Sequence, residues 1–327
     1  MVRQTRFLSG VGVGAAVCAV ALAAGCSSSG SGTPPSGALP QVTGAVGQRA
    51  GITLPTGAPT PAKLETSVLV QGSGTKLASG ELVAVDYTVM NWSGSKMLGD
   101  TYSKDGGKTP NQPQVITLGS QGLLPAWNTA LTGARVGSRI EVVAPPSEAF
   151  GSQGNSQVGV GPNDVLVFVL DIDSAYPAKA DITGKQGPQT DPSLPSVTGD
   201  PGSGTLTVTV PAGKKPPADL VADTLIHGTG ETVAAGKTLI LQYSGVDWNT
   251  RTTFDSSFTR GQAFSTVIGA GKVIKGWDTG LVGKHVGDRV LLVVPPALGY
   301  GPSGGQPSAG IGADDTLVFV VDIVDAL

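Results

Sequence analysis

The sequence predicts two α+β domains of about 120 residues each, with several β-strands and one short helix in every domain. The chain has 327 residues, a length that suits two domains. An internal repeat supports the division, because residues 68–74 (VLVQGSG) resemble residues 224–230 (TLIHGTG) at an offset of 156. The apolar runs and turns within each copy then indicate the fold class.

The apolar runs of the second copy are short and bounded by turn residues, which predicts β-strands. The clearest runs are residues 239–243 (LILQY), 289–294 (RVLLVV) and 316–321 (TLVFVV). One stretch has helical spacing instead, because Ile274, Trp277 and Leu281 recur at i, i+3 and i+7. A single helix among several strands is expected to pack on one face of a sheet.

The two copies do not keep one offset throughout. Tyr87 and Tyr243 are 156 residues apart, whereas Trp127 and Trp277 are 150 apart, so the first copy has six extra residues between its Tyr and its Trp. The stretch between the copies is rich in Pro, Gly, Asp and Gln and has no apolar periodicity, which predicts a linker. The expected divisions are a first domain at 50–176, a linker at 177–204 and a second domain at 205–327.

The N-terminus has the pattern of a secretory signal. Arg3 and Arg6 precede an uncharged apolar run at residues 7–25, and Cys26 follows it. This order is similar to a bacterial lipobox, in which the cysteine is lipidated and becomes the new N-terminus. The expected segments are a signal peptide at 1–25 and a lipidated Cys26 with a flexible tether at 26–49. A transmembrane anchor and a signal cleaved without lipidation are the alternatives.

Lipidation of Cys26 would attach the mature protein to the cell membrane on its extracytoplasmic face. The cysteine count agrees with this expectation. Of the two cysteines, Cys18 lies within the predicted signal, so the mature chain keeps only Cys26. It therefore has neither an intramolecular disulfide nor a cysteine nucleophile.

Composition argues against two other functional classes. The net charge is −3 and no strongly basic stretch is present, so nucleic acid is not an expected partner. The two histidines, His227 and His285, lie in different contexts and have no cysteine partner. We therefore expect no metal site and no other cofactor.

Four short motifs of the second copy belong together. They are FDSS at 254–257, VIKGW at 273–277, GYG at 299–301 and LVF at 317–319. Their order, spacing and residue types resemble the FKBP-type peptidyl-prolyl cis/trans isomerases across residues 220–327. The resemblance implies a twisted antiparallel β-sheet wrapped around a short helix, activity on proline-containing polypeptides, and macrolides as further ligands.

The chemistry of this activity needs no cofactor. Amide resonance opposes rotation about an X–Pro bond with a barrier of ~18–20 kcal/mol, yet no bond has to break. A catalyst need only bind the twisted amide better than the planar one. An apolar pocket for the proline ring and a few donors for the flanking carbonyls are sufficient.

The resemblance places an apolar pocket in the second copy. Trp277 would form its floor, and Tyr243, Phe264 and Phe319 its walls. The remaining side and rim residues would be Val273, Ile274, Phe254 and Ile311. Any one of these side chains would be ordinary core in another protein, because aromatic residues dominate cores generally.

The resemblance also assigns the polar groups. The backbone N–H of Ile274 and the hydroxyl of Tyr300 would donate to substrate carbonyls. Asp255 would lie at the pocket edge, near Tyr243 and Arg260. Together with the apolar residues, these groups make the second copy the expected isomerase.

The first copy departs from the pattern. Gly99 stands where the motif's first Phe is expected, Gln114 replaces the aromatic at Phe264, and Phe150 replaces the hydroxyl-bearing Tyr300. The residues expected to be retained or mildly changed are Tyr87, Asp100, Leu123, Leu124, Trp127 and Phe168. The first copy is therefore expected to be folded but weakly active or inactive.

Two functions remain open from the sequence. The first is an isomerase that assists the folding of secreted or cell-envelope proteins, with its activity mainly in the second domain. The second is a non-catalytic peptide-binding or scaffold lipoprotein that uses the same pocket. An isomerase assay discriminates between them.

Overall fold

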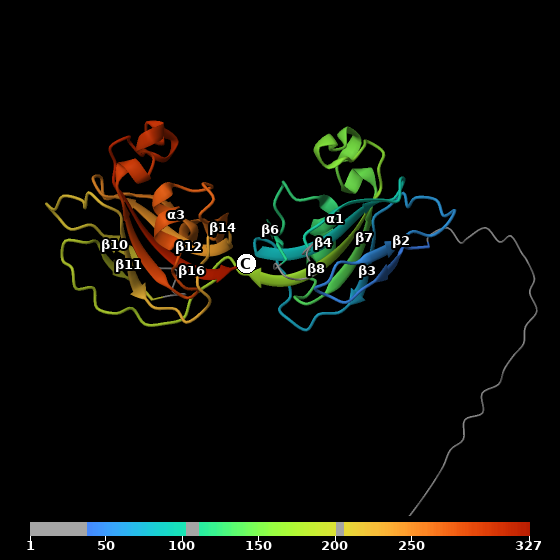
Figure 1. Ribbon diagram of the computed structural model, residues 1–327, viewed down its shortest axis with the longest axis horizontal. Coiled ribbons are helices and arrows are strands. Elements are labelled where there is room, and N and C mark those ends of the chain that lie inside the picture. The colour runs from blue at the N-terminus through green and yellow to red at the C-terminus, as the bar shows by residue number, and fades with distance from the viewer. Residues whose placement is uncertain (1–37, 103–110, 201–205) are drawn as a thin grey trace, which may run out of the picture. The chain divides into compact units, whose positions relative to one another are not determined.

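The structure is a computed structural model that describes residues 38–102, 111–200 and 206–327. Within these ranges it contains two domains of the same topology, each with a six-stranded antiparallel sheet. Each sheet curves around a short helix, α1 in the first domain and α3 in the second (Figure 1). The predicted α+β class with two similar domains is therefore confirmed.

The sheet of the first domain has the order β3-β7-β8-β4-β5, and β6 also pairs with β4. Its elements are β3 (Glu65–Val70), β4 (Leu82–Asn91), β5 (Lys96–Asp100), β6 (Gln114–Thr117), α1 (Pro125–Leu131), β7 (Arg139–Ala144) and β8 (Leu166–Tyr176). Short 3-10 turns at Pro146–Glu148, Gly151–Gln153 and Ser156–Val158 connect β7 to β8.

The sheet of the second domain has the matching order β11-β15-β16-β12-β13, and β14 pairs with β12. Its elements are β11 (Val221–Ile226), β12 (Thr238–Asp247), β13 (Thr253–Ser256), α2 (Ser257–Arg260), β14 (Phe264–Val267), α3 (Lys275–Leu281), β15 (Arg289–Val294) and β16 (Leu317–Ala326). The 3-10 turns before β16 are Pro296–Leu298, Gly301–Ser303 and Pro307–Ala309. The one-turn helix α2 was not expected, because four residues are too few to show helical periodicity.

Strand β15 shows why its sequence is an unbroken apolar run. Val290, Leu292 and Val294 pack in the core around α3, whereas Leu291 and Val293 pack in a second cluster on the opposite face. All five side chains are fully buried. A strand that is covered on both faces does not alternate between apolar and polar residues.

Helix α3 lies unusually close to the sheet. A Cβ atom built on Gly276 would lie 2.5 Å from Val294 Cγ1, and one on Gly280 would lie 2.6 Å from Leu292 Cδ2. Glycine in a helix costs about 1 kcal/mol relative to alanine. Here the two glycines allow the close packing that holds the helix in place.

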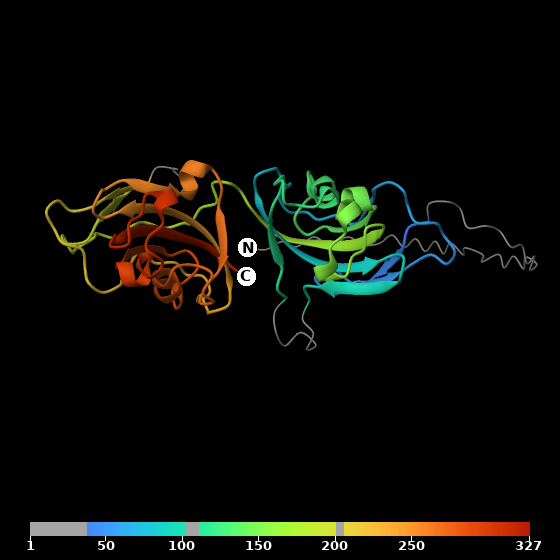
Figure 2. The same cartoon turned by 90° about the horizontal axis from the view of Figure 1, so that it is seen from above.

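A β-hairpin covers the outer face of each sheet, the face opposite the helix. In the first domain it is formed by β1 (Gln41–Thr43) and β2 (Gly51–Thr53), and in the second by β9 (Ser196–Thr198) and β10 (Thr207–Thr209). The blue β1–β2 hairpin lies against the first sheet in Figure 2. In the second domain, Val197 and Val210 pack on Leu291 and Val293.

A buried Arg–Asp pair fixes each hairpin. Arg139 Nε donates to Asp171 Oδ1 at 2.7 Å, and the same guanidinium donates to the hairpin carbonyls of Gly44 and Gln48 at 2.6 Å. In the second domain, the Nε of Arg289 donates to Asp322 Oδ1 at 2.7 Å. Its Nη1 donates to the carbonyl of Gly199 at 2.8 Å.

The hairpins correct the expected domain limits. Residues 41–43 were expected in the flexible tether at 26–49, but they form β1. Residues 196–198 were expected in the linker at 177–204, but they form β9 and belong to the second domain. Strands of three residues are too short to show a sequence periodicity. They are stabilised by contacts with the sheet beneath them.

The predicted signal peptide and Cys26 lie outside the described residues. In the part of the chain that the structure describes, no helix combines the length and apolar character needed to cross a membrane.

Candidate active site

The second domain has a cavity of about 220 Å³ between its sheet and α3. Strands β12, β13, β14 and β16, helix α3 and the loops beside it all contribute to its lining. The lining residues are Tyr243, Phe254, Asp255, Phe264, Lys272, Val273, Ile274, Trp277, Tyr300 and Phe319. All but Lys272 are residues that the sequence placed in a pocket.

Aromatic rings pack edge to face around this cavity. Trp277 lies at its centre, with its ring centroid 5.2 Å from that of Tyr243, 5.3 Å from Phe319 and 6.1 Å from Phe264. Edge-to-face pairs at these distances are favourable beyond the area they bury. The rings therefore support one another as rigid walls for a small apolar group.

Gly245 makes room for one of these rings. A Cβ atom at Gly245 would lie 2.6 Å from Phe254 Cζ and 3.0 Å from Phe319 Cε1. Phe254 thus packs over bare backbone and contacts Phe319 with the ring centroids 5.5 Å apart. Any larger residue at position 245 would displace Phe254 from the cavity wall.

A charged group stands at the edge of the cavity. The Tyr243 hydroxyl donates to Asp255 Oδ2, and Arg260 Nη1 donates to Asp255 Oδ1. Arg260 Nη2 also donates to the Tyr243 hydroxyl at 3.1 Å, and its guanidinium lies 5.4 Å from the Tyr243 ring centroid. These contacts hold the three side chains in place relative to one another.

Two hydrogen-bond donors at the cavity remain available to a ligand. In the described part of the chain, neither the backbone N–H of Ile274 nor the hydroxyl of Tyr300 donates to a protein acceptor. Ile274 is the N-cap of α3, where backbone N–H groups lack helical partners. The buried indole Nε1 of Trp277 likewise has no acceptor among the described residues.

Two residues that the sequence placed at the pocket do not line the cavity. Ile311 is 3% exposed and packs in the core around Trp277, so it supports the cavity from behind and is not part of its rim. Arg260 contacts Asp255 and Tyr243 but does not line the cavity itself. Over residues 38–102, 111–200 and 206–327, no cluster of His, Cys, Asp and Glu is arranged to hold a metal ion.

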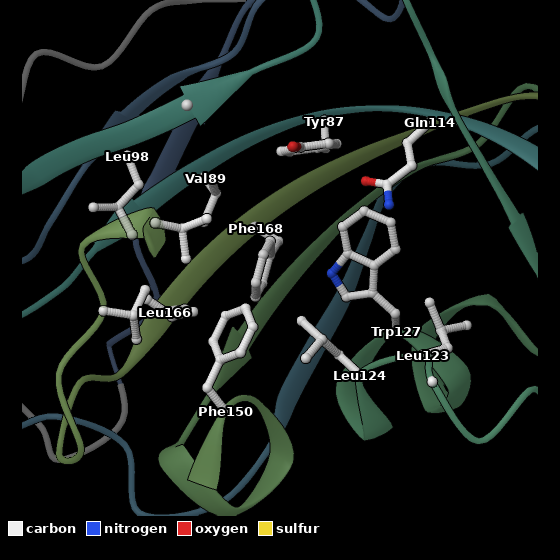
Figure 3. Close-up of a pocket in the computed structure, with 14 residues that line it drawn as sticks. Tyr87, Val89, Leu98, Gln114, Leu123, Leu124, Trp127, Phe150, Leu166 and Phe168 are labelled. Atoms are coloured by element: carbon white, nitrogen blue, oxygen red, sulfur yellow. The ribbon is translucent and has the colours of Figure 1, made fainter. Parts of the chain in front are cut away.

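The matching cavity of the first domain is larger, at about 350 Å³. Figure 3 shows Trp127 between Leu124 and Gln114, with Phe168 and Phe150 on the other side of the opening. Its remaining lining residues are Tyr87, Val89, Leu98, Gly99, Gly122, Leu123, Val158, Val160 and Leu166. The first pocket is therefore larger than the second and has more aliphatic side chains in its lining.

Strand pairing corrects the alignment of the two copies by one residue. Gly245 pairs with Asp255, and the equivalent Val89 pairs with Gly99. Gly99 therefore replaces the carboxylate of Asp255, and Leu98 takes the position of Phe254. The swap is compensated, because the Val89 side chain stands at the position where the Phe254 ring packs over Gly245 in the second domain.

Asp100, which was expected to be the retained acid, is not in the pocket. It pairs with Thr88, as Ser256 pairs with Ser244, and its carboxylate lies 3.1 Å from Arg49 Nε. The first pocket thus has no carboxylate. The hydroxyl residue that follows marks the correct register. Thr101 Oγ1 accepts a hydrogen bond from the backbone N–H of Tyr87, and Ser257 Oγ accepts the equivalent bond from that of Tyr243.

Two other substitutions lie where the sequence placed them. Gln114 pairs with Val85 as Phe264 pairs with Leu241, but its side chain is exposed, so no buried, unpaired amide results. Phe150 has the backbone conformation of Tyr300, and it offers no hydroxyl.

The sequence of both domains matches a known family. Residues 73–173 and 229–324 match the family described as FKBP-type peptidyl-prolyl cis-trans isomerase. The chain belongs to this family. One matched region lies in each domain and contains its helix and every strand of its sheet, in full or in large part, except β3 or β11, so the protein is a tandem FKBP-type peptidyl-prolyl cis-trans isomerase.

Single-domain relatives and a multidomain structure are similar to parts of this FKBP-type chain. A FK506-binding protein of Streptomyces anulatus is 41% identical over 112 residues, which cover 34% of this chain and 90% of the relative. A probable FK506-binding protein of Corynebacterium glutamicum is 40% identical over 111 residues, 34% of this chain and 89% of the relative. The crystal structure of the three FKBP domains of wheat FKBP73 aligns over 81% of this chain and 94% of that chain, at 18% identity and a TM-score of 0.32.

Proposed function

We propose that the second domain supplies the prolyl isomerase activity of this chain and that the first domain binds polypeptide without efficient catalysis. The observation that carries the proposal is the difference in polar groups. The second pocket combines the Asp255 carboxylate with the hydroxyl of Tyr300, and the first pocket has Gly99 and Phe150 in their places.

Catalysis in the second pocket follows from its geometry. The proline ring enters between Trp277 and Phe264, where water is excluded from the planar, more polar form of the amide. The free N–H of Ile274 and the Tyr300 hydroxyl hold carbonyls on either side of the bond that rotates. Asp255 fixes Tyr243 and Arg260 at the opening, so the site is already formed when the polypeptide arrives.

The clients in this proposal are proline-containing secreted or cell-envelope proteins, because Arg3, Arg6, the apolar run at 7–25 and Cys26 suit export and a lipid anchor. The relatives named as FK506-binding proteins suggest that a macrolide would compete for the second pocket. The non-catalytic, peptide-binding role is favoured only in the first domain, where Gly99 and Phe150 replace the polar groups of the second pocket.

Replacing Asp255 with alanine in the full-length protein is expected to lower kcat/KM for a proline-containing peptide at least tenfold. The variant loses the acceptor that orients Tyr243 and Arg260, and tenfold corresponds to about 1.4 kcal/mol of transition-state stabilisation. The measurement is isomerisation of a short peptide, with circular dichroism to confirm folding.

The matched control is Asp100→Ala, which removes the acid that a simple alignment equates with Asp255. Asp100 contacts Arg49 outside the pocket, so its loss is expected to leave turnover unchanged. Equal turnover of wild type and Asp255→Ala would move the activity to the first domain or to other residues, and the proposed division of labour would be wrong.

Replacing Cys26 with alanine is expected to release the protein from the membrane fraction or to block its processing. The thiol of Cys26 is the group that the predicted lipid anchor requires. Fractionation of cells that express the wild type and the variant measures this directly. A variant that stays as firmly in the membrane fraction as the wild type would reject the lipid anchor.

A further inference from the structure

The edge strand β3 of the first domain exposes three consecutive apolar side chains. Val68, Leu69 and Val70 are 54%, 39% and 44% exposed. Strand β3 is at the end of its sheet and pairs with β7 on one side only, within the described residues. An exposed apolar edge strand is a template for pairing with another chain.

The matching strand of the second domain is covered. Leu225 and Ile226 of β11 are only 5% and 2% exposed. Residues 182–187 run beside them, since the Gly187 N–H donates to the carbonyl of Leu225 at 3.0 Å. A Cβ atom on Gly184 would lie 2.5 Å from Ile226 Cγ2, so the covering segment is in close contact with the strand.

The two edges present the same geometry. Leu69 is a bulge residue in the pairing of β3 with β7, and Leu225 is a bulge residue in the pairing of β11 with β15. The Leu225 carbonyl accepts the bond from Gly187, whereas no described residue outside the sheet donates to the Leu69 carbonyl. The first edge thus offers a carbonyl acceptor and an exposed apolar surface. The equivalent groups of the second edge are covered by residues 182–187.

Residues 27–37, which lie shortly before the first domain, lack large aliphatic or aromatic side chains for this role. The covering segment of the second domain includes Ile182, which is 4% exposed. The corresponding stretch, residues 27–37, consists of Ser, Gly, Thr and Pro. Apart from Pro34 and Pro35, it has no apolar side chain that could bury Val68, Leu69 and Val70.

We propose that β3 is a docking edge for an extended apolar segment of an unfolded client polypeptide. The segment would add to β3 through backbone hydrogen bonds. Its alternate side chains would pack on Val68 at the helix face of the sheet and on Val70 at the outer face, because Val68 pairs with Ile140 and Val70 with Arg139. In the second domain the occupant is an irregular extended segment and not a strand of another sheet, which favours an unfolded client over a second copy of this chain. That the docked polypeptide is a folding client rests on the proposed isomerase function.

The test uses the full-length protein and a fluorescent, proline-free peptide of about twelve residues, alternating Val and Thr with lysines at both ends. At ~3.3 Å per residue it spans β3 with room to spare, and without proline it cannot report on isomerisation. We expect V68K/V70K to weaken its binding at least tenfold. The milder Val68→Thr, which introduces the residue found at position 224, is expected to weaken binding less and to exclude unfolding as the cause.

Val282→Lys is the matched control, because Val282 is also exposed, at 37%, but lies after α3 in the second domain. It is expected to bind the peptide like the wild type. Unchanged binding by V68K/V70K would overturn the proposal. Two other results would also overturn it. In the first, the wild type binds no peptide but forms a dimer that V68K/V70K abolishes. In the second, the wild type binds no peptide but binds phosphatidylglycerol vesicles, and V68K/V70K abolishes that binding.

Isomerisation of a short proline peptide is measured in parallel on the same proteins. The edge variants are expected to leave it unchanged. Absence of isomerase activity in the wild type would refute the proposed function, and loss of peptide binding in V68K/V70K would still establish the docking edge.

Discussion

Replacing Arg289 with leucine is expected to destabilise the second domain by about 3–5 kcal/mol, because removal of one partner leaves a buried charge without compensation. Arg289 is 1% exposed and donates twice to Asp322, which is also 1% exposed. The variant also deprives the Gly199 carbonyl of its donor, so the β9–β10 hairpin is expected to loosen. Urea denaturation of the full-length protein measures the loss.

Two further variants distinguish a buried-charge effect from general damage. The double variant Arg289→Leu/Asp322→Leu is expected to recover much of the stability, since apolar replacements for both partners often cost little. Lys237→Ala removes the cation of an exposed pair with Glu231, 3.5 Å apart, and is expected to cost less than about 1 kcal/mol. A loss for Arg289→Leu as small as that for Lys237→Ala would show that the pair does not hold the hairpin.

The sequence predicted those parts of the site that depend on dense local motifs. The VIKGW segment carries Ile274 and Trp277 within four positions, and the structure places both at the cavity. Such a segment has a fixed geometry, because it runs directly into the first turn of α3. Its register does not depend on a distant strand.

The error at Gly99 has the opposite cause. The same bulge occurs in both domains, at Leu98 between β4 and β5 and at Phe254 between β12 and β13. The offset of 156 set by Tyr87 and Tyr243 therefore continues through Leu98 and Gly99. Asp100 was matched with Asp255 because an acid is expected at the pocket edge. The bond from the Tyr87 N–H to Thr101, which matches the bond from the Tyr243 N–H to Ser257, supports the pairing at the offset of 156.

The hairpins were missed because their information is non-local. Arg139 and Asp171 are 32 residues apart, and Arg139 binds carbonyls more than 90 residues away. The same pair recurs as Arg289 and Asp322, so the repeat did contain a signal: two charged residues at matching positions inside otherwise apolar strands. Buried charges of this kind need partners, which identifies the outer face as covered.

The buried acid Glu141 makes the stability of the first domain depend on pH. It lies on β7, is 2% exposed, and its Oε1 has no partner among the described residues. Burial raises the pKa of Glu141 to about 7. The side chain of Asp173 is partly open to solvent, and its pKa is also raised to about 7, first by partial desolvation and then by the nearby Asp86.

The direction of the effect follows from these raised values. A carboxyl that titrates near 7 when folded and at about 4.3 when unfolded favours the folded state while it is protonated. This contribution is complete below about pH 4 and is lost as the pH rises through 7. The first domain is therefore expected to be more stable at pH 5 than at pH 8.

Replacing Glu141 with leucine, the residue at position 291 of the second domain, is expected to stabilise the first domain at pH 8 by about 3 kcal/mol. The gain is expected to shrink towards pH 5, where Glu141 is largely protonated in the folded chain. Denaturant titration of the full-length protein at both pH values measures it. Glu141→Gln is the matched control, because it removes the charge but leaves a buried polar group, so it should flatten the pH dependence and gain less. An unaltered pH dependence in both variants would mean that Glu141 is not the group that titrates, and Asp173 would be the next residue to replace.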